Sequence, residues 1–268
     1  MLQKKKNYFC LYIFSLKVTF LGTGTSQGIP IIGSKHPVCL SKNPKDKRLR
    51  VSVLIELNNL NILIDCGPDF RQQLLKTDCS KIDAVLFTHE HSDHTAGLDD
   101  LRPFYFRQGK IPIYAQYRVI DALKNRFDYI FKNDKNYPGI LGLETNCIDN
   151  NPFVHDNIKI IPIEVYHDKL PVFGYRINNF AYITDAKKVP FEEISKLKNL
   201  DVLVINALRK EPHSSHFSLN EALNFIQIVK PKKAYLTHLS HHLGFHEEVE
   251  KTLPKDIYLS YDGLEIIM

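Results

Sequence analysis

The sequence has no long apolar run, no paired set of cysteines and no strong excess of one charge. None of its 268 residues lies in a stretch that approaches the ~20 apolar residues of a membrane span, so we expect no membrane partner. The net charge of +5 is mildly basic. It suits an anionic substrate, but it is too small to indicate a nucleic-acid partner.

The cysteines are odd in number and widely spaced, which does not fit a disulfide framework. The five are Cys10, Cys39, Cys66, Cys79 and Cys147. Together with a histidine-rich motif, this pattern indicates a reducing compartment, so we predict a cytoplasmic protein.

The first sixteen residues differ from the rest of the chain. Lys4–Lys6 precede a short apolar run, Tyr8–Leu16, which mimics the first two parts of a signal peptide. No small-residue cleavage site follows, and Lys17–Leu21 leads directly into the first predicted turn. We interpret residues 1–16 as a non-essential extension, with export as the lesser alternative, and residues 17–268 as one domain.

The turn from Gly22 to Gly28 contains three glycines but no lysine followed by serine or threonine. It is therefore not a phosphate-binding P-loop. We expect its glycines to let the backbone approach a metal site closely.

Apolar runs with strand or helix spacing fill the chain, and no linker separates them. Strands are predicted at 17–21, 51–57, 61–65, 84–87, 111–114, 158–165, 173–177, 180–184, 202–206 and 233–237, with two more in 254–268. Helices are predicted at 70–75, at 118–127 and after the capping box that begins at Ser218. Segments 34–44 and 133–151 are expected to be irregular. The pattern supports one mixed α/β domain.

Seven residues, Thr88–His94, carry three histidines and two acids directly after an apolar strand. Imidazole and carboxylate groups suit zinc, manganese or iron. In an extended loop His89 and His91 would point the same way and bind one metal. The adjacent Asp93 and His94 would point apart and could serve a second metal.

Four later polar residues stand at or just past apolar strands: His167, Asp185, Asn206 and His238. Any one of them alone would more often be an ordinary strand-end residue than a ligand. Because three of them occur together with the histidine-rich loop, we interpret His167, Asp185 and His238 as ligands. Asn206 is a poor metal ligand and is left out. Asp65, which ends another strand, is expected to bind the backbone of the loop.

The His-x-His-x-Asp-His pattern resembles the metallo-β-lactamase-fold hydrolases. The resemblance implies a four-layer αββα sandwich, an α/β (α+β) fold with two packed sheets and helices outside. It also implies two divalent metal ions, zinc or manganese, that hold a hydroxide between them as the nucleophile. The implied ligands are His89, His91 and His167 for the first metal, Asp93, His94 and His238 for the second, and Asp185 as the bridge.

The match narrows to one subgroup, typified by the phosphoribosyl cyclic-phosphate phosphodiesterase of bacterial phosphonate breakdown. It rests on the glycine turn and on segments 167–175, 236–241 and 262–266. The resemblance implies a small anionic phosphodiester as substrate. It places His216, just before the helix that Ser218 begins, at the leaving group. Asp93 and His216 are therefore the predicted catalytic residues.

A structural zinc site is a further expectation from the resemblance. The subgroup builds it from a Cys-x-Cys-x-x-Cys cluster and a histidine, where this chain has Ser34, His36, Cys39 and His241. Serine is not a credible zinc ligand, and structural zinc sites use four protein ligands. His36, Cys39 and His241 could hold zinc with a fourth group from elsewhere, and a vestigial loop is the alternative.

The predicted function is metal-dependent hydrolysis of a small cyclic or diester phosphate. One alternative is a tRNA 3′-end processing nuclease, which would need a basic arm, but segment 133–151 has Lys135 as its one basic residue. Thiolester hydrolase and β-lactamase activities rank lower. A non-catalytic metal or cofactor carrier is an alternative of another class, against which the full ligand set argues. A nucleic-acid partner is not expected, and a homodimer stays open.

Overall fold

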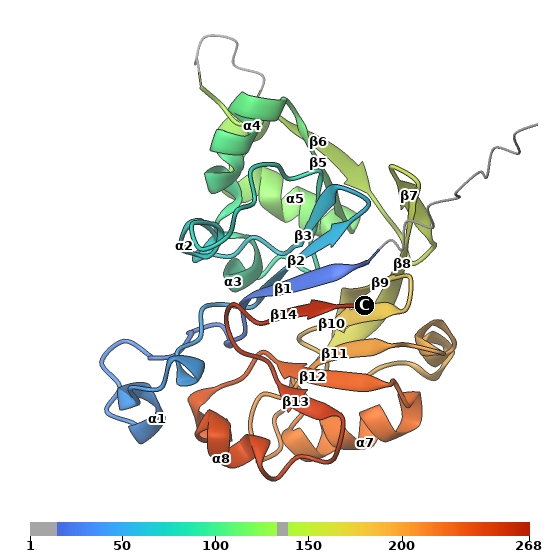
Figure 1. Cartoon of the computed structure of the whole chain (residues 1–268). Coiled ribbons are helices and arrows are strands. Elements are labelled where there is room, and N and C mark those ends of the chain that lie inside the picture. Colours follow the sequence, from blue (N-terminus) through green and yellow to red (C-terminus); the bar gives the residue numbers. More distant parts are fainter. Residues whose placement is uncertain (1–14, 133–138) are drawn as a thin grey trace, which may run out of the picture.

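Two packed sheets with helices on their outer faces make up the computed structural model, which describes residues 15–132 and 139–268 (Figure 1). In this part of the chain each sheet has seven strands. The first sheet runs in the order β14 (Glu265–Ile267), β1 (Lys17–Gly22), β2 (Ser52–Leu57), β3 (Leu60–Ile64), β4 (Ala84–Leu86), β5 (Ile111–Ala115), β6 (Leu143–Cys147). The second runs β13 (Ile257–Leu259), β12 (Lys233–Thr237), β11 (Val202–Asn206), β10 (Phe180–Ile183), β9 (Leu170–Ile177), β8 (Ile158–His167), β7 (Phe153–His155).

The helices are mostly short, and those described do not include one long and apolar enough to cross a bilayer. The α-helices are α1 (Pro37–Leu40), α2 (Phe70–Leu74), α3 (Ser92–Thr95), α4 (Arg102–Gln108), α5 (Tyr117–Arg126), α6 (Asp128–Phe131), α7 (Leu219–Val229) and α8 (His246–Glu250). Four 3-10 helices are η1 (Pro44–Asp46), η2 (Leu98–Leu101), η3 (Phe191–Leu197) and η4 (His241–Leu243).

Three apolar layers hold the four structural layers together. One lies between the sheets, and the other two lie between each sheet and its helices. Strand β4 shows why the strands read as continuous apolar runs: Ala84 and Leu86 face the other sheet, while Val85 faces the helices. A strand that is buried on both faces needs apolar residues at every position. The expected αββα sandwich is therefore the observed one.

Parallel pairing aligns the carboxyl ends of several strands. Strands β3 to β6 pair in parallel, and so do β10 to β13. Strand β8 also runs parallel to β10, because both are antiparallel to β9 between them. Loops that leave β4, β8, β10 and β12 therefore share one edge of the sandwich.

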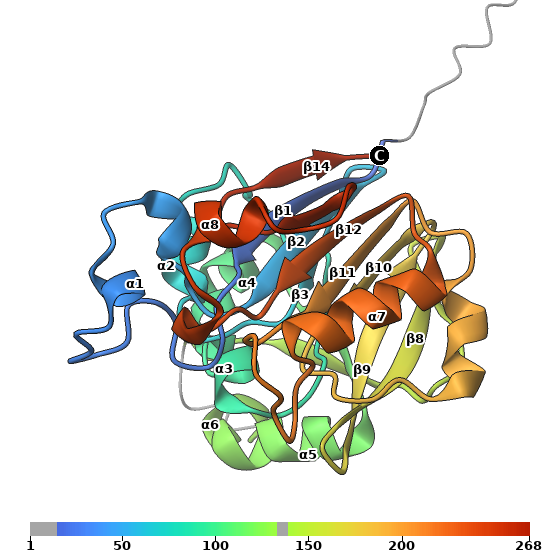
Figure 2. The same cartoon turned by 90° about the horizontal axis from the view of Figure 1, so that it is seen from below.

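Helix α7 covers the second sheet, lying across the strands β10 to β12 (Figure 2). Its start is set by the predicted capping box, because the Ser218 hydroxyl accepts a bond from Glu221 N and the Glu221 carboxylate accepts one from Ser218 N. Its apolar face, which includes Leu219, Phe225 and Ile226, packs on the sheet.

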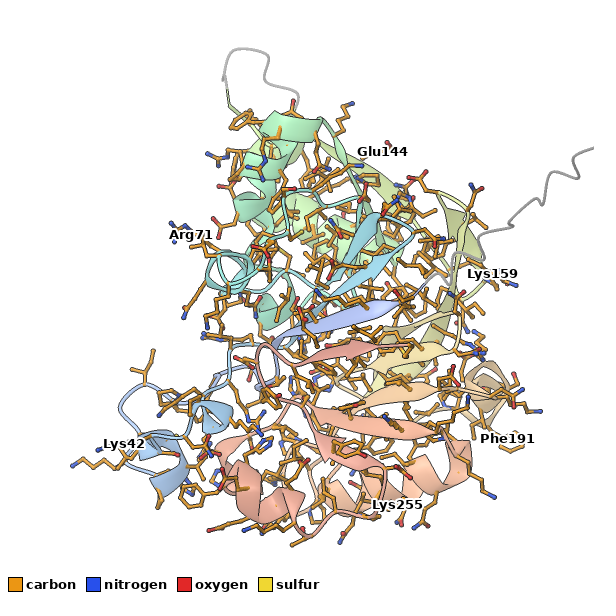
Figure 3. All side chains as sticks on the ribbon, in the orientation of Figure 1. Lys42, Arg71, Glu144, Lys159, Phe191 and Lys255 are labelled. Atoms are coloured by element: carbon orange, nitrogen blue, oxygen red, sulfur yellow. The ribbon has the colours of Figure 1, made fainter. Side chains whose placement is uncertain are left out.

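Two segments expected to be irregular contain regular structure. Strand β6 lies within 133–151 as an edge strand paired in parallel with β5. Its residues are half-buried or exposed and do not alternate, so only the neighbouring strand decides that it is extended. Helix α1 lies within 34–44, on a segment that projects from the sandwich, and Lys42 lies near its outer end (Figure 3).

The packed domain includes Leu16, one residue earlier than predicted. Leu16 is 4% exposed and exchanges two backbone hydrogen bonds with Met268, at 3.0 and 2.9 Å. It extends the pairing of β1 with β14 at the end of the sheet. Residues 1–14 of the predicted extension, as well as residues 133–138, lie outside the described residues.

Leu16→Ala should lower the free energy of unfolding by about 2–4 kcal/mol, because it removes a buried side chain from the layer between the sheets. Leu40→Ala is the matched control, since Leu40 is 64% exposed. Urea denaturation of both variants measures the difference. Equal losses would show that Leu16 does not belong to the packed domain.

Candidate metal centre

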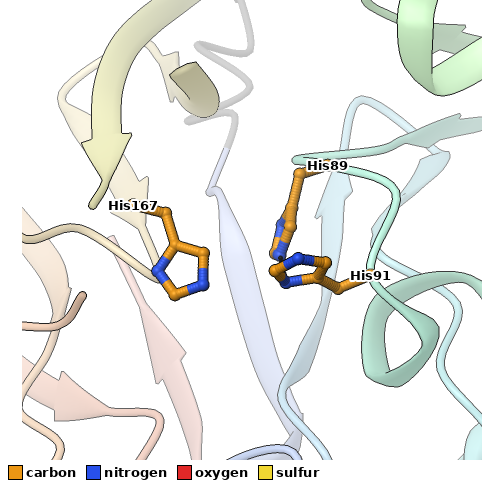
Figure 4. A group of neighbouring side chains, drawn as sticks. All are labelled: His89, His91 and His167. Atoms are coloured by element: carbon orange, nitrogen blue, oxygen red, sulfur yellow. Dashed lines mark hydrogen bonds between the residues drawn. The ribbon is translucent and has the colours of Figure 1, made fainter. Parts of the chain in front are cut away.

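Seven side chains predicted as ligands meet at the shared edge of the sandwich. The loop after β4 supplies His89, His91, Asp93 and His94; His167 ends β8, and Asp185 and His238 follow β10 and β12. We call this set the histidine–aspartate centre. In Figure 4 His167 approaches from one sheet, and His89 and His91 approach from the other. The centre is therefore assembled from both halves of the chain.

The loop after β4 is not extended throughout, because its second half forms the helical turn α3. His91 precedes this turn, and its carbonyl accepts bonds from His94 N at 3.1 Å and Thr95 Oγ1 at 2.9 Å. The expectation that Asp93 and His94 point apart is wrong. The turn brings Asp93 Oδ2 to 3.2 Å from His94 Nε2.

Nitrogen and oxygen atoms of the centre lie close together in overlapping groups. The histidine triad is His89, His91 and His167, and the aspartate–histidine group is Asp93, His94 and His238; within each, potential ligand atoms lie within 4.8 Å of one another. His89 Nε2 and His91 Nδ1 are 2.9 Å apart, which confirms that these two side chains point the same way. Asp185 reaches both groups: its Oδ2 is 3.3 Å from His94 Nε2, its Oδ1 is 3.2 Å from His238 Nε2, and it also lies within 4.8 Å of ligand atoms of His89 and His167.

The geometry fits ligands that share a cation better than it fits hydrogen bonds. His94 Nε2 and His238 Nε2 are buried and make no hydrogen bond with acceptable angles, although carboxylate oxygens lie 3.2–3.3 Å away. Two ligand atoms each ~2.1 Å from a tetrahedral zinc ion would themselves be ~3.4 Å apart. The residues present therefore fit divalent metal ions.

The charges of the centre also favour a cation. Burial favours the neutral carboxyl of Asp93 and Asp185, but the imidazoles of His94 and His238 outweigh it and hold both pKa values below the usual range. Burial likewise opposes a charge on His94, yet the carboxylates of Asp93, Asp185 and Asp65 raise its pKa well above the ordinary value. Burial lowers the pKa of His89, which keeps its nitrogens available to a metal.

Asp65 binds the backbone of the loop after β4, as predicted, and it also contacts the ligand His94, which was not predicted. It accepts hydrogen bonds from Thr88 N and Thr88 Oγ1, both at 2.8 Å, and contacts His94 Nδ1 at 2.7 Å. A histidine that is held through one ring nitrogen presents the other in a fixed direction. Asp65 thus fixes the Nε2 atom of His94 toward the other ligands.

Three residues of the site adopt left-handed backbone conformations directly after their strands. The φ angles are 63° for Asp65, 56° for Asp185 and 56° for His238. Such conformations are uncommon for residues other than glycine and concentrate at functional sites. They turn each side chain sharply at the strand end, and no pattern in the sequence indicates them.

Asn206 supports the centre without belonging to it. Its side-chain oxygen accepts a bond from Ala186 N at 2.8 Å, and its nitrogen donates to Ala186 O at 2.9 Å. It therefore holds the segment that follows Asp185. Its position after an apolar strand was the available signal, and its role is structural.

The glycines that approach the metal loop are not those expected. A Cβ on Gly67 would lie 2.1 Å from Asp93 O, so only glycine fits beside the loop there. Gly22 and Gly24 approach the backbone of residues 48–50 instead. The glycine turn supports the metal centre only indirectly. Its Thr23 O accepts a hydrogen bond from the backbone N of Leu239, the residue after His238.

The structure does not assemble the predicted structural zinc site. His36 and His241 lie together, with ring centroids 4.7 Å apart. Cys39, however, is 2% exposed and packs with Ile29 and Val38 in a small apolar cluster. Of the potential metal-binding groups among the described residues, none includes Cys39. Cys39 is therefore a core residue of this segment.

His216 lies at the edge of the centre, where the sequence placed it. Its Nε2 is 3.1 Å from Asp185 Oδ1, its ring stacks on His238 with centroids 4.9 Å apart, and Nδ1 contacts Ser215 Oγ at 2.9 Å. Burial lowers its pKa to about 4 despite the Asp185 carboxylate. His216 is therefore neutral at pH 7 and offers an N–H group.

Comparison with known proteins identifies the scaffold. A family model described as a beta-lactamase superfamily domain matches residues 60–239. A solved structure of a diphosphatase from the PhnP family is 38% identical, with a TM-score of 0.89, over 95% of this chain and 97% of that one. The chain belongs to the metallo-β-lactamase superfamily.

Two curated relatives are similar to this chain over part of their own length. An octanoyltransferase of Porphyromonas gingivalis is 40% identical over 94% of this chain and 52% of its own length. A ribonuclease Z of Methanococcus maripaludis is 25% identical over 81% of this chain and 65% of its own length. The chain thus spans about half of the first relative and less than two thirds of the second. It is a homologue of PhnP-family phosphohydrolases with a distant similarity to ribonuclease Z.

Asp65→Asn should weaken metal binding roughly 10- to 100-fold, as removal of a ligand's supporting partner does in other metal sites. Calorimetric titration of the metal-free protein with Zn²⁺ measures the change. Asp83→Asn is the control, because Asp83 is also buried but accepts its bond from Asn61 N at the other end of β3. Unchanged zinc affinity in Asp65→Asn would contradict the supporting role.

Proposed function

We propose that this metallo-β-lactamase superfamily chain is a dinuclear metal-dependent phosphodiesterase that acts on a small cyclic or diester phosphate. The observation that carries the proposal is the convergence of the histidine triad and the aspartate–histidine group on either side of Asp185. When bound there, two divalent ions would supply positive charge for the phosphoryl oxygens and lower the pKa of the attacking water. Zinc and manganese both accept this donor set.

The chain's own residues would hold and orient these ions. His89, His91 and His167 are the proposed ligands of one ion, Asp93, His94 and His238 those of the other, and Asp185 is shared. The Asp65 carboxylate fixes the orientation of His94.

Positive charge at the rim supports an anionic substrate. His213 contacts His216, with their Nδ1 atoms 3.3 Å apart. Burial, and after it the charges of Arg209 and Lys187, lower the pKa of His213. Lys187 is paired with Glu221 at 2.6 Å, whereas Arg209 donates to the backbone carbonyls of Glu211 and Pro212 and keeps its charge. Arg209 would therefore favour the approach of a phosphate to this loop.

The named activities of the relatives provide the competing substrates. The solved structure that is 38% identical over 95% of this chain is that of a diphosphatase, so a diphosphate is tested beside the diesters. The octanoyltransferase match makes an octanoyl thiolester the substrate of a second candidate function, acyl thiolester hydrolysis. A tRNA precursor tests the ribonuclease Z alternative.

One preparation should be stripped of metal, reloaded with Zn²⁺ or Mn²⁺, and assayed on five substrates. These are bis(p-nitrophenyl) phosphate, a cyclic sugar phosphate, a diphosphate, an octanoyl thiolester and a tRNA precursor. We expect metal-dependent hydrolysis of the small phosphate esters. A preference for the thiolester or the tRNA precursor would overturn the proposed substrate class.

Asp93→Ala and Asp185→Ala should each lose most turnover of a diester while the fold survives, because each removes an anionic ligand. Metal analysis should show less than two ions per chain in both variants. Asp201→Ala provides the control, since Asp201 pairs with Lys232 at the surface, at 2.6 Å. The two-metal interpretation would be wrong if Asp93→Ala kept a near-wild-type rate with full metal content.

We expect the negative charge of a bound phosphate to raise the pKa of His216, so that this side chain can carry a proton to the leaving group. His216→Ala should then slow hydrolysis of an alkyl diester by roughly 10²–10⁴, the usual contribution of a positioned proton donor. An aryl diester such as a p-nitrophenyl ester should suffer much less, because its leaving group departs without a proton. Metal content is measured in parallel, because His216 also lies within ligand distance of His167 and Asp185. Equal losses on both esters would assign His216 to phosphate binding, and loss of metal would make it a ligand.

A further inference from the structure

Arg118 on helix α5 connects the two halves of the histidine–aspartate centre. Its Nη1 donates to the Glu90 carboxylate, and its Nη2 donates to Pro171 O and, at 2.9 Å, to Gln116 Oε1. Glu90 belongs to the loop after β4, whereas Pro171 belongs to β9 of the other sheet. One guanidinium group therefore joins segments that are far apart in the sequence.

At its first contact, Arg118 holds the loop that presents two members of the histidine triad. Glu90 lies between His89 and His91 in the sequence, so a fixed Glu90 carboxylate restrains the backbone from which both imidazoles project. The Arg118 and Glu90 side chains are 30% and 26% exposed, so solvent screens this pair only in part. The same helix supports the far end of the loop, where Arg126 Nη1 donates to Thr95 Oγ1 at 2.5 Å.

At its second contact, Arg118 holds the hairpin that presents the third member of the triad. Strands β8 and β9 pair with Tyr166 opposite Pro171 and His167 opposite Leu170. The bond to Pro171 O therefore restrains the hairpin one residue pair away from His167.

Other hydrogen bonds also join β9 to the loop after β4, but they lie further from the turn of the β8–β9 hairpin than the Arg118 contact does. Phe173 N donates to Thr88 O at 3.0 Å, and Tyr175 Oη donates to Phe87 O at 2.6 Å. Both tie β9 to the first two residues after β4, which precede the ligands His89 and His91. Arg118 is attached two residues further toward the hairpin turn, at Pro171, where the segment that carries His167 is farther from these bonds.

We propose that Arg118 is a positioning residue that sets the distance between the His89–His91 pair and His167, and so the affinity of the ion that the histidine triad binds. The inference rests on the proposed metal centre but not on the proposed substrate. A guanidinium group can donate in two fixed directions at once, which a lysine ammonium on its flexible stem does not reproduce. Arg118→Lys should therefore behave like Arg118→Gln.

The test separates the two metal positions. His91→Ala removes a ligand of the histidine triad, and Asp93→Ala removes a ligand of the aspartate–histidine group. In the Asp93→Ala background, Arg118→Gln and Arg118→Lys should each weaken Zn²⁺ binding roughly 10- to 100-fold, as loss of a ligand's support does elsewhere. In the His91→Ala background, the same changes should leave Zn²⁺ affinity within about twofold, because the remaining ion does not use the triad.

Arg176→Gln controls for a general loss of stability. Arg176 is also half-buried and donates to three backbone carbonyls, those of Asn178, Lys196 and Lys198, at 2.6–2.9 Å. It should lower the melting temperature at least as much as Arg118→Gln without changing Zn²⁺ affinity in either background.

Three results would overturn the role of Arg118. They are equal weakening in both backgrounds, no weakening in the Asp93→Ala background, and full rescue of affinity by Arg118→Lys. Because the readout is metal affinity, a wrong substrate assignment would leave it unchanged, so failure of the proposed function and failure of this inference are distinguishable.

Discussion

Buried negative charge is the constraint on which the centre depends. Asp65 and Asp185 are almost fully buried, Asp93 is largely so, and all three place an oxygen within 3.3 Å of a ring nitrogen of His94. Like charges buried this closely need a counter-charge. In the protein alone a proton on His94 meets part of this need, and divalent cations would meet it fully. The three buried carboxylates therefore make the binding of cations at this site favourable.

The fold meets this constraint by dividing the ligands between two sheets. Rigid strands bring each residue to the same edge, and left-handed turns at Asp65, Asp185 and His238 aim the side chains inward. Contacts that cross between the sheets then fix the spacing, from the Tyr175 hydroxyl in the interior to Arg118 at the rim. Neither half of the chain could form the centre by itself.

The scaffold explains metal binding more fully than it explains substrate choice. The diphosphatase shares this fold, whereas the ribonuclease Z and the octanoyltransferase match this chain over 65% and 52% of their own lengths. Function resides in the groups that surround the reacting atoms, and a common fold can carry several chemistries. In this chain the loop with His213 and His216, and the nearby cation Arg209, are the groups on which the proposal of an anionic phosphate substrate rests.

The sequence by itself determined the ligand types, their order and the strands that carry them. Apolar runs that end in His167, Asp185 or His238 are local signals, and the spacing of the loop after β4 is a local signal too. Tertiary structure alone decided that α3 turns Asp93 and His94 toward each other, that β6 is a strand, and that Cys39 packs in a small apolar cluster. Each of these outcomes depends on a partner distant in the chain: Asp65 for His94, β5 for β6, and an apolar contact such as Phe245 for the Cys39 cluster. Such pairings leave no periodic trace in the sequence, because they follow from which surfaces meet when the two sheets pack.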